Sequence, residues 1–163
     1  MVAFLTTMPI GVAGAVSRKG SATIESHLLD VAKNFASFGL FGKLVGGKIV
    51  PLEASDTAAV IHGLLVRAYP SGTTTIAATL GTSVPPTEGF TDVLVRGYAI
   101  VKKSAGVPAK GGQVYVRIAN PLSGRPIGAI ETALVSGETV AVSRCLFTTA
   151  ADSDGFVEIE FNI

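Results

Sequence analysis

The sequence predicts an all-β fold, a single-domain β-sandwich or β-barrel with an extended N-terminal arm and at most one short helix. The first observation behind this prediction is the alternation of apolar and polar residues in several short runs, typical of strands with one buried face. The second is that Gly, Pro, Ser and Asp fill the segments between these runs, where they favour turns. The third is the length of 163 residues, typical of one domain, so we assign residues 1–163 to a single domain.

Residues 1–20 are predicted to form the extended arm. The segment begins with the apolar run MVAFLTTMPIGVAGAV, which Pro9, Gly11 and Gly14 interrupt, and its first positive charge is Arg18. A secretory signal peptide has a basic start and an unbroken apolar stretch. We therefore interpret this segment as an arm and not as a targeting signal.

Residues 24–38 are ambiguous between a helix and a strand. Their apolar positions follow helical spacing and predict a short helix that carries Ile24, Leu28, Val31, Phe35 and Phe38 on one side. The opening residues ATIE are equally compatible with a strand, because short apolar runs do not distinguish the two. Both alternatives stay open at this point.

Seven other runs are predicted strands. They are KIVPL (48–52), AVIHGLLVRAY (59–69), TDVLVRGYAIVKK (91–103), QVYVRIA (113–119), GAIETALV (128–135), TVAVSRCLF (139–147) and FVEIEFNI (156–163). In QVYVRIA, the alternation opposes Val114, Val116 and Ile118 to Gln113, Tyr115 and Arg117. In the last run it opposes Val157, Ile159, Phe161 and Ile163 to Glu158, Glu160 and Asn162, and we expect the two carboxylates to form a solvated stripe.

The stretch GKLVGGKI, residues 42–49, comes within one residue of the phosphate-binding template G-x-x-x-x-G-K-[ST]. That template needs a hydroxyl after its lysine to hold magnesium, and Ile49 has none. It also needs a helix to follow, but Pro51 stands two residues later. We therefore predict a Gly-Gly turn between two strands at Gly46 and Gly47, and no nucleotide site.

The residues that could carry catalysis or bind a metal are few and scattered. His27 and His62 are the only histidines, the spacings H-x-x-x-H and C-x-x-C are absent, and no G-x-S-x-G elbow occurs. We interpret His62 as a sheet residue with a satisfied hydrogen bond, the single Cys145 as a small buried hydrophobe, and DSDG (152–155) as a turn. The sequence predicts no enzyme, no catalytic residue, no metal and no cofactor.

Composition bears on the partners of the chain. The formal net charge is +1, so nothing favours nucleic acid or an anionic membrane as a partner. Only 15% of the residues are charged, compared with about 25% in ordinary soluble domains. The mean hydropathy is +0.52, yet no run approaches the roughly 18 apolar residues that a membrane helix needs. A surface this poor in charge indicates burial of part of it in an oligomer or larger assembly.

Several segments in succession resemble the bacteriophage structural cement, or capsid decoration, protein family. They are IGVAGAVSR, ATIESHLLD, FGKLVGGKIVPLEASDTAAVIHGLLVRAYP, VLVRGYAIVKK, GGQVYVRIANP and FTTAADSDGFVEIEFNI, and they cover nearly the whole chain in order. The resemblance implies a non-enzymatic structural protein of the virion, made in the host cytoplasm, that sits on the outer surface of an icosahedral head. It implies homodimers or homotrimers that clamp neighbouring major capsid protein subunits against the pressure of the packaged DNA. It implies no small-molecule substrate, and no catalytic residue is carried over.

Two segments are predicted to contact the capsid or a second copy of the chain. The first is the arm and its exit, with the apolar residues Val2, Phe4, Leu5 and Ile10 and the cations Arg18 and Lys19. The second is the connection between residues 71 and 92, which contains Val84, Pro85, Pro86 and Phe90. The alternative for the first segment is that the arm folds back as an edge strand of its own sheet.

Two other functions remain as alternatives. A receptor- or glycan-binding β-domain of a virion or secreted protein needs an aromatic platform, whereas this chain has no Trp and only three scattered tyrosines. A small hydrolase built on a β-barrel needs a catalytic assembly that no motif indicates. Fold alone does not decide between these functions.

Overall fold

The computed structural model describes residues 10–67 and 84–163. Strands dominate these residues, which contain no α-helix and two short 3-10 turns. The elements are η1 (Lys19–Ser21), β1 (Thr23–Leu29), β2 (Phe41–Val45), β3 (Lys48–Pro51), η2 (Ala58–Val60), β4 (Gly63–Val66), β5 (Phe90–Ala105), β6 (Gln113–Arg117), β7 (Ile130–Glu131), β8 (Thr139–Phe147) and β9 (Phe156–Phe161). The predicted all-β class is confirmed.

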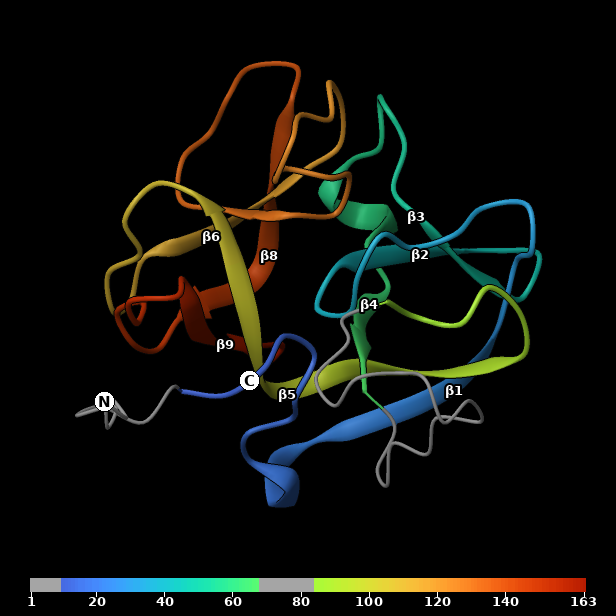
Figure 1. Cartoon of the computed structure of the whole chain (residues 1–163), viewed down its shortest axis with the longest axis horizontal. Helices are drawn as coiled ribbons and strands as arrows, with labels where there is room; N and C mark the ends of the chain where they lie inside the picture. The colour runs from blue at the N-terminus through green and yellow to red at the C-terminus, as the bar shows by residue number, and fades with distance from the viewer. Residues whose placement is uncertain (1–9, 68–83) are drawn as a thin grey trace, which may run out of the picture.

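The long strand β5 belongs to two closed rings of strands. In the N-terminal ring the order is β1-β3-β2-β4-β5, and β1 closes it by pairing with both β3 and β5. In the C-terminal ring the order is β5-β7-β6-β8-β9, and β9 closes it by pairing with β5. Figure 1 shows the two rings as separate lobes that meet along β5. The fold is therefore a single domain of two five-stranded barrels that share one strand.

Gly97 marks the point at which β5 passes from one ring to the other. Residues before it pair with β1, and residues from Gly97 onward pair with β9. Its φ of +135° is a conformation that glycine adopts far more readily than other residues. A Cβ at this position would lie 2.9 Å from the Cα of Ala22, so the close packing of the two segments also requires glycine.

The Gly-Gly turn predicted in GKLVGGKI is confirmed. Strands β2 and β3 are antiparallel, and Val45 lies opposite Lys48, which leaves Gly46 and Gly47 as a two-residue loop. Their φ values of +58° and +79° are those of a type I′ hairpin turn. The resemblance to a phosphate-binding loop therefore comes from a hairpin, with no helix after it.

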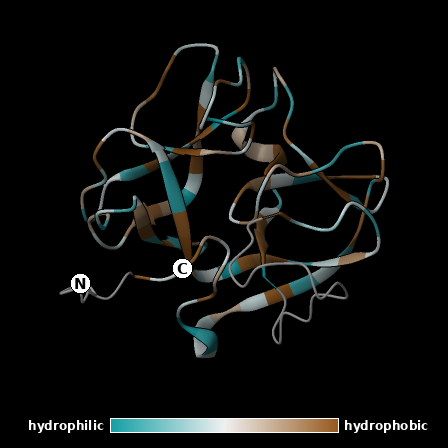
Figure 2. Cartoon of the chain, viewed as in Figure 1, coloured by the Kyte–Doolittle hydropathy of each residue, from teal (hydrophilic) through white to brown (hydrophobic). Residues whose placement is uncertain are grey.

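Of the two alternatives left open for residues 24–38, the helix is wrong, and the strand is confirmed at the start of the segment. Residues 23–29 form β1, which lies antiparallel to β5 with six residue pairs in register. Residues 30–40, which a helix over this segment would include, form turns and irregular structure instead. The ladder between β1 and β5 therefore outweighs the helical spacing of a few apolar side chains. Figure 2 shows hydrophobic and hydrophilic bands in succession along β1.

The other predicted strands are confirmed to different extents. The run 139–147 coincides with β8, and the runs beginning at 48, 113 and 156 contain β3, β6 and β9. The run 91–103 lies within β5, which begins one residue earlier and ends two residues later. In the run 128–135, only Ile130 and Glu131 form a strand. In the run 59–69, β4 is limited to Gly63–Val66, and residues 68–69 lie outside the described residues.

Each ring encloses apolar side chains from its own strands. In the N-terminal ring Leu29, Ile49, Leu65 and Val93 pack in one cluster, with Phe35 from the β1–β2 connection. In the C-terminal ring all five strands contribute to a second cluster that includes Val101, Val116, Ile130, Phe147 and Ile159. Residues from β2 and β4 join this second cluster, where the phenyl groups of Phe41 and Phe161 contact edge to face with their centres 5.3 Å apart. The N-terminal and C-terminal rings of strands therefore share an apolar contact.

The described part of the N-terminal arm lies against its own sheet. The N–H of Gly14 donates to the carbonyl of Ile100 at 2.8 Å, and the N–H of Ser17 donates to that of Tyr98 at 3.1 Å. The arm thus adds hydrogen bonds to β5 around Ala99, as in the alternative in which it folds back. Val2, Phe4 and Leu5 lie outside the described residues.

Candidate functional site

An apolar patch lies on one face of β1 and the start of β5. Leu28 lies directly opposite Phe90 in the ladder, so their side chains share a face, and Ile24 shares it because it is four residues before Leu28 on the same strand. The exposed fractions are 75% for Phe90, 45% for Ile24 and 38% for Leu28. These three residues are called the β1–β5 patch below.

The β1–β5 patch lies on the ladder between β1 and β5, which pairs residue by residue from Ile24 to Leu28. Between its apolar residues, the Ser26 hydroxyl donates to Asp92 at 2.9 Å on the same face. Covering a Phe or Leu side chain contributes about 1.5–3 kcal/mol relative to leaving it in water. A preformed sheet face with such residues is therefore suited to pack against a partner.

The connection that leads into β5 adds further exposed apolar surface. Val84 is 67% exposed, and Pro86 and Phe90 are also exposed, whereas Pro85 is buried. Of the four residues predicted here as contacts, Pro85 is therefore not available on the surface. Residues 71–83 of the same connection lie outside the described residues.

Arg18, one of the two cations predicted at the exit of the arm, forms an ion pair within its own chain. Arg18 donates to the carboxylate of Glu158 on β9 at 2.7 Å, and its guanidinium lies 4.0 Å from the centre of the Tyr98 ring. Lys19 is exposed in η1, and Ile10 is partly exposed while its N–H donates to Asp152. Arg18 therefore ties the arm to β9 of its own chain.

Glu158 is the acceptor at the centre of this arm contact. Besides Arg18, its carboxylate accepts hydrogen bonds from the hydroxyls of Ser17 and Thr148. Burial acts to raise the pKa of Glu158, but the hydrogen bonds from Thr148, Ser17 and Arg18 outweigh it, so the pKa is lowered. The expectation of a solvated stripe is wrong for Glu158, which is buried because the arm covers it.

Arg117 forms a second polar cluster in the C-terminal half of the domain, on the face of β6 opposite the core residue Val116. Its guanidinium donates to Glu131 at 2.6 Å and to Glu138 at 2.8 Å, and also to the carbonyls of Ala119 and Asn120. The hydrogen bond to Glu131 raises the pKa of Arg117 further, although burial opposes this. All these donors and acceptors are matched within the chain, which is typical of a structural ion pair.

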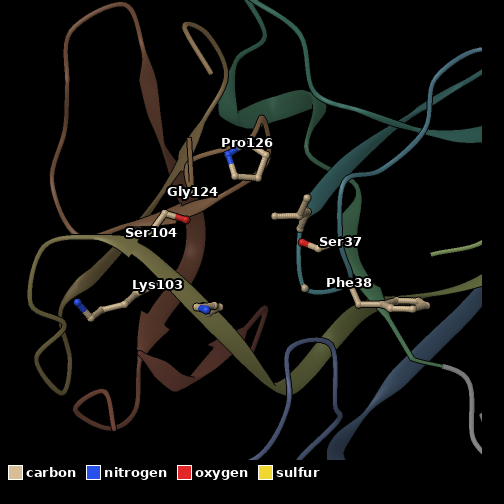
Figure 3. A pocket seen from close by; sticks show the side chains of 9 residues that line it. Ser37, Phe38, Lys103, Ser104, Gly124 and Pro126 are labelled. Carbon is tan, nitrogen blue, oxygen red and sulfur yellow. The ribbon is translucent and has the colours of Figure 1, made fainter. Parts of the chain in front are cut away.

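A cavity lies between the two rings, bordered by residues 37–40, residues 102–104, Gly124 and Pro126 (Figure 3). Its volume is about 100 Å³, well below the roughly 300 Å³ at which small-molecule pockets begin. Figure 3 shows the side chain of Lys103 extending away from the cavity, and its ammonium donates to the carbonyl of Gly106 at 3.0 Å. This cavity is not suited to a sugar or a nucleotide.

Glu25, His27 and His62 converge at the N-terminal ring. The Nε2 atoms of His27 and His62 lie 3.0 and 3.1 Å from the same Glu25 oxygen and 3.2 Å from each other. The hydrogen bond with His27 lowers the pKa of the Glu25 carboxyl, although its burial opposes this. The sequence interpretation treated His62 as isolated, because 35 residues separate it from His27. The one local signal was the spacing of Glu25 and His27, which share a face of a strand.

Cys145 is buried in β8, as predicted. Burial raises the pKa of its thiol, which therefore stays protonated and unreactive at neutral pH. The interpretation of DSDG as a turn is also confirmed, because Asp152 accepts from the N–H groups of Asp154 and Phe156. No helix among the described residues is long and apolar enough to cross a membrane.

Comparisons with known proteins give matches of two kinds. The model of the XM1 gp53 minor capsid protein family matches residues 1–161. A solved structure described as "The capsid of Myoviridae Phage XM1" contains a chain with the same fold, with a TM-score of 0.74 and 22% sequence identity. That match covers 98% of this chain and 95% of the other. No curated protein matches the chain.

Proposed function

Because the chain belongs to the XM1 gp53 minor capsid protein family, we propose that it decorates the outer surface of an icosahedral phage head and clamps neighbouring major capsid protein subunits. The expected relationship to phage capsid proteins is confirmed at the level of the family, which makes the chain a structural protein of a virion. Decoration of the head surface and clamping of its subunits are more specific roles than membership of this family, and they are what we propose here. The family match over residues 1–161 is the observation that carries the proposal, because it involves the whole domain and not one motif.

The β1–β5 patch supports a role in binding other proteins. Phe90, Ile24 and Leu28 expose apolar surface on a rigid sheet, where a flat neighbour can cover all three at once. Apolar and aromatic residues of this kind supply much of the energy in protein interfaces. We assign this face to the major capsid protein.

The low charge of the chain supports contact with several neighbours. With 15% charged residues and a net charge of +1, the chain has fewer charged side chains on its surface than most monomeric soluble proteins, which favours burial of that surface against neighbours. In a capsid lattice, several modest contacts act together, so avidity exceeds the affinity of any one contact. Self-association into a dimer or trimer is part of the same proposal and multiplies these contacts.

A structural role without catalysis fits the polar clusters of the described residues. Arg117 is matched to Glu131 and Glu138 inside the domain, and Glu158 is matched to the arm. Cys145 is buried and protonated. Each of these groups stabilises the fold, and we assign none of them to a reaction, a substrate or a cofactor.

Reconstitution on phage heads tests the proposal. Heads of the source phage that lack this chain are mixed with the purified protein and sedimented, and the bound protein is measured against the major capsid protein. We expect saturable binding to the shell and a higher temperature of DNA release from the decorated heads. Binding only to tails, or no binding to heads, contradicts the proposal.

A further inference from the structure

The two histidines of the chain lie side by side at one end of the N-terminal ring. Glu25 and His27 are two residues apart on β1 and point to the same face, and His62 immediately precedes β4. The strands β1 and β4 do not pair with each other, because each pairs with a different side of β5 in this ring. The three side chains therefore connect β1 to the residue just before β4, although these two strands do not pair with each other.

The three donor atoms form a nearly equilateral triangle. Its sides are 3.0 Å and 3.1 Å between the Glu25 oxygen and the two Nε2 atoms, and 3.2 Å between the Nε2 atoms themselves. With metal–ligand bonds of about 2.0 Å, two ligands of a tetrahedral zinc site lie about 3.3 Å apart. The observed triangle thus matches one face of a tetrahedral coordination shell to within a few tenths of an ångström.

Hydrogen bonding alone does not account for all three contacts. Each imidazole Nε2 has one position in the plane of its ring, which carries either a hydrogen or a lone pair. Each nitrogen is nevertheless within hydrogen-bond distance of both other atoms. Two hydrogen bonds at most can be well aligned among them, whereas a cation at the centre accepts a lone pair from all three at once.

We propose that Glu25, His27 and His62 bind a divalent transition-metal ion, with Zn²⁺ as the ion that best fits. Two imidazoles and one carboxylate are a ligand set that zinc uses, and the three atoms lie together in the folded chain without rearrangement. The exposed fractions of 18% and 26% for the side chains of His27 and His62, and 46% for that of Glu25, leave a path for the ion and room for a fourth ligand such as water.

The bound ion stabilises the N-terminal ring. It joins β1 to the residue that opens β4, across a ring whose closing contact between β1 and β3 has only two residue pairs in register. Because the unfolded chain does not hold these three residues together, binding energy adds to the stability of the folded state. This inference does not depend on the capsid role and is tested separately from it.

Zinc binding by the untagged full chain tests the proposal. Metal-free protein is titrated with Zn²⁺ against a coloured chelator, and with Co²⁺, whose visible absorption reports tetrahedral coordination. The expected result is one ion per chain and a higher melting temperature with Zn²⁺. His27→Ala and His62→Ala are each expected to weaken binding by at least about tenfold, the scale seen even for supporting residues of metal sites.

The matched control is Ser26→Ala, which lies between the two ligands on β1 but faces Asp92 on the other side of the strand. Ser26→Ala is expected to bind Zn²⁺ as the unchanged protein does. Circular dichroism shows whether each variant is folded, and Glu25→Gln, which keeps the shape of the side chain, is the second variant if a histidine variant fails to fold. The proposal is overturned if the unchanged protein binds no Zn²⁺, or if folded His27→Ala or Glu25→Gln binds it equally well.

Discussion

Arg117 and Glu131 form an ion pair at 2.6 Å in which the two side chains are only 1% and 2% exposed. The pair joins β6 to β7, which is only two residues long and pairs with β5 and β6 through two residue positions each. Removing one member of a buried pair leaves an uncompensated charge inside the protein. The pair therefore reinforces the short ladder between β6 and β7 in the C-terminal ring.

Glu131→Gln is predicted to lower the free energy of unfolding by about 3 kcal/mol. The guanidinium of Arg117 keeps Glu138 as a partner, but that carboxylate is partly exposed and compensates the charge less well. Urea unfolding monitored by circular dichroism measures the change. The double variant Arg117→Met/Glu131→Leu is expected to recover much of the loss, and an unchanged midpoint for Glu131→Gln contradicts this account.

Glu158 is predicted to make stability depend on pH on the acid side. Its pKa in the folded chain is lowered, so its contribution is fully present above the unfolded value of about 4.3 and is lost as the pH falls through the folded value. Glu158→Gln is expected to be less stable than the unchanged protein by about 1 kcal/mol at pH 7. The difference should shrink below about pH 4.

Thermal unfolding of both proteins between pH 7 and pH 3 measures this effect. Glu160→Gln is the control, since it removes a carboxylate from the same strand that does not bind Ser17, Arg18 or Thr148. A constant difference between the Glu158→Gln variant and the unchanged protein across the whole pH range contradicts the assignment.

Gly97→Ala is predicted to destabilise the fold by about 2 kcal/mol or more, since it combines backbone strain with overpacking. The φ of +135° disfavours alanine, and its Cβ would lie 2.9 Å from the Cα of Ala22. Gly20→Ala is the control, because a Cβ at Gly20 meets no atom within 4 Å. Urea unfolding compares the two variants, and equal effects would show that the passage of β5 between the rings does not require glycine.

How much of this fold can be predicted from the sequence depends on how local the signal is. Alternation locates β8 and β9 along the chain. Burial does not follow the alternation throughout, because Glu158 is buried and Arg144 in β8 has a φ of +51°. Alternation does not identify β1, because the apolar residues of this segment follow helical spacing. The segment is a strand because it pairs with β5. The double use of β5 is not predictable from the alternation, since pairing partners are set by contacts between distant segments.

The same limit explains the side-chain clusters. Arg117 lies on the polar face of its strand, as the alternation predicts, yet it is buried because Glu131 and Glu138 approach it from later segments. His27 and His62 meet only because β1 and β4 lie on either side of β5. Of the predicted contact residues, the exposed Val84 and Phe90 remain candidates, and the engaged Arg18 shows that a terminal cation can find its partner within the chain.

Phe90→Ser is predicted to weaken binding to phage heads by about tenfold, the loss expected for one central aromatic contact. Because Phe90 is 75% exposed, stability should change by no more than about 0.5 kcal/mol. Leu134→Ser is the matched control, since Leu134 is 65% exposed but lies in the connection between β7 and β8, away from the β1–β5 patch. Co-sedimentation with heads measures binding, and equal binding by the two variants would move the capsid contact away from the β1–β5 patch.

The most direct test of the proposed function is quantitative mass spectrometry of purified particles of the source phage, comparing the copy number of this chain with that of the major capsid protein. A protein that decorates and clamps the whole lattice is predicted to be present at a copy number of the same order as the major capsid protein. A handful of copies per particle, or none, contradicts a role across the lattice and points to a single position in the virion or to receptor binding.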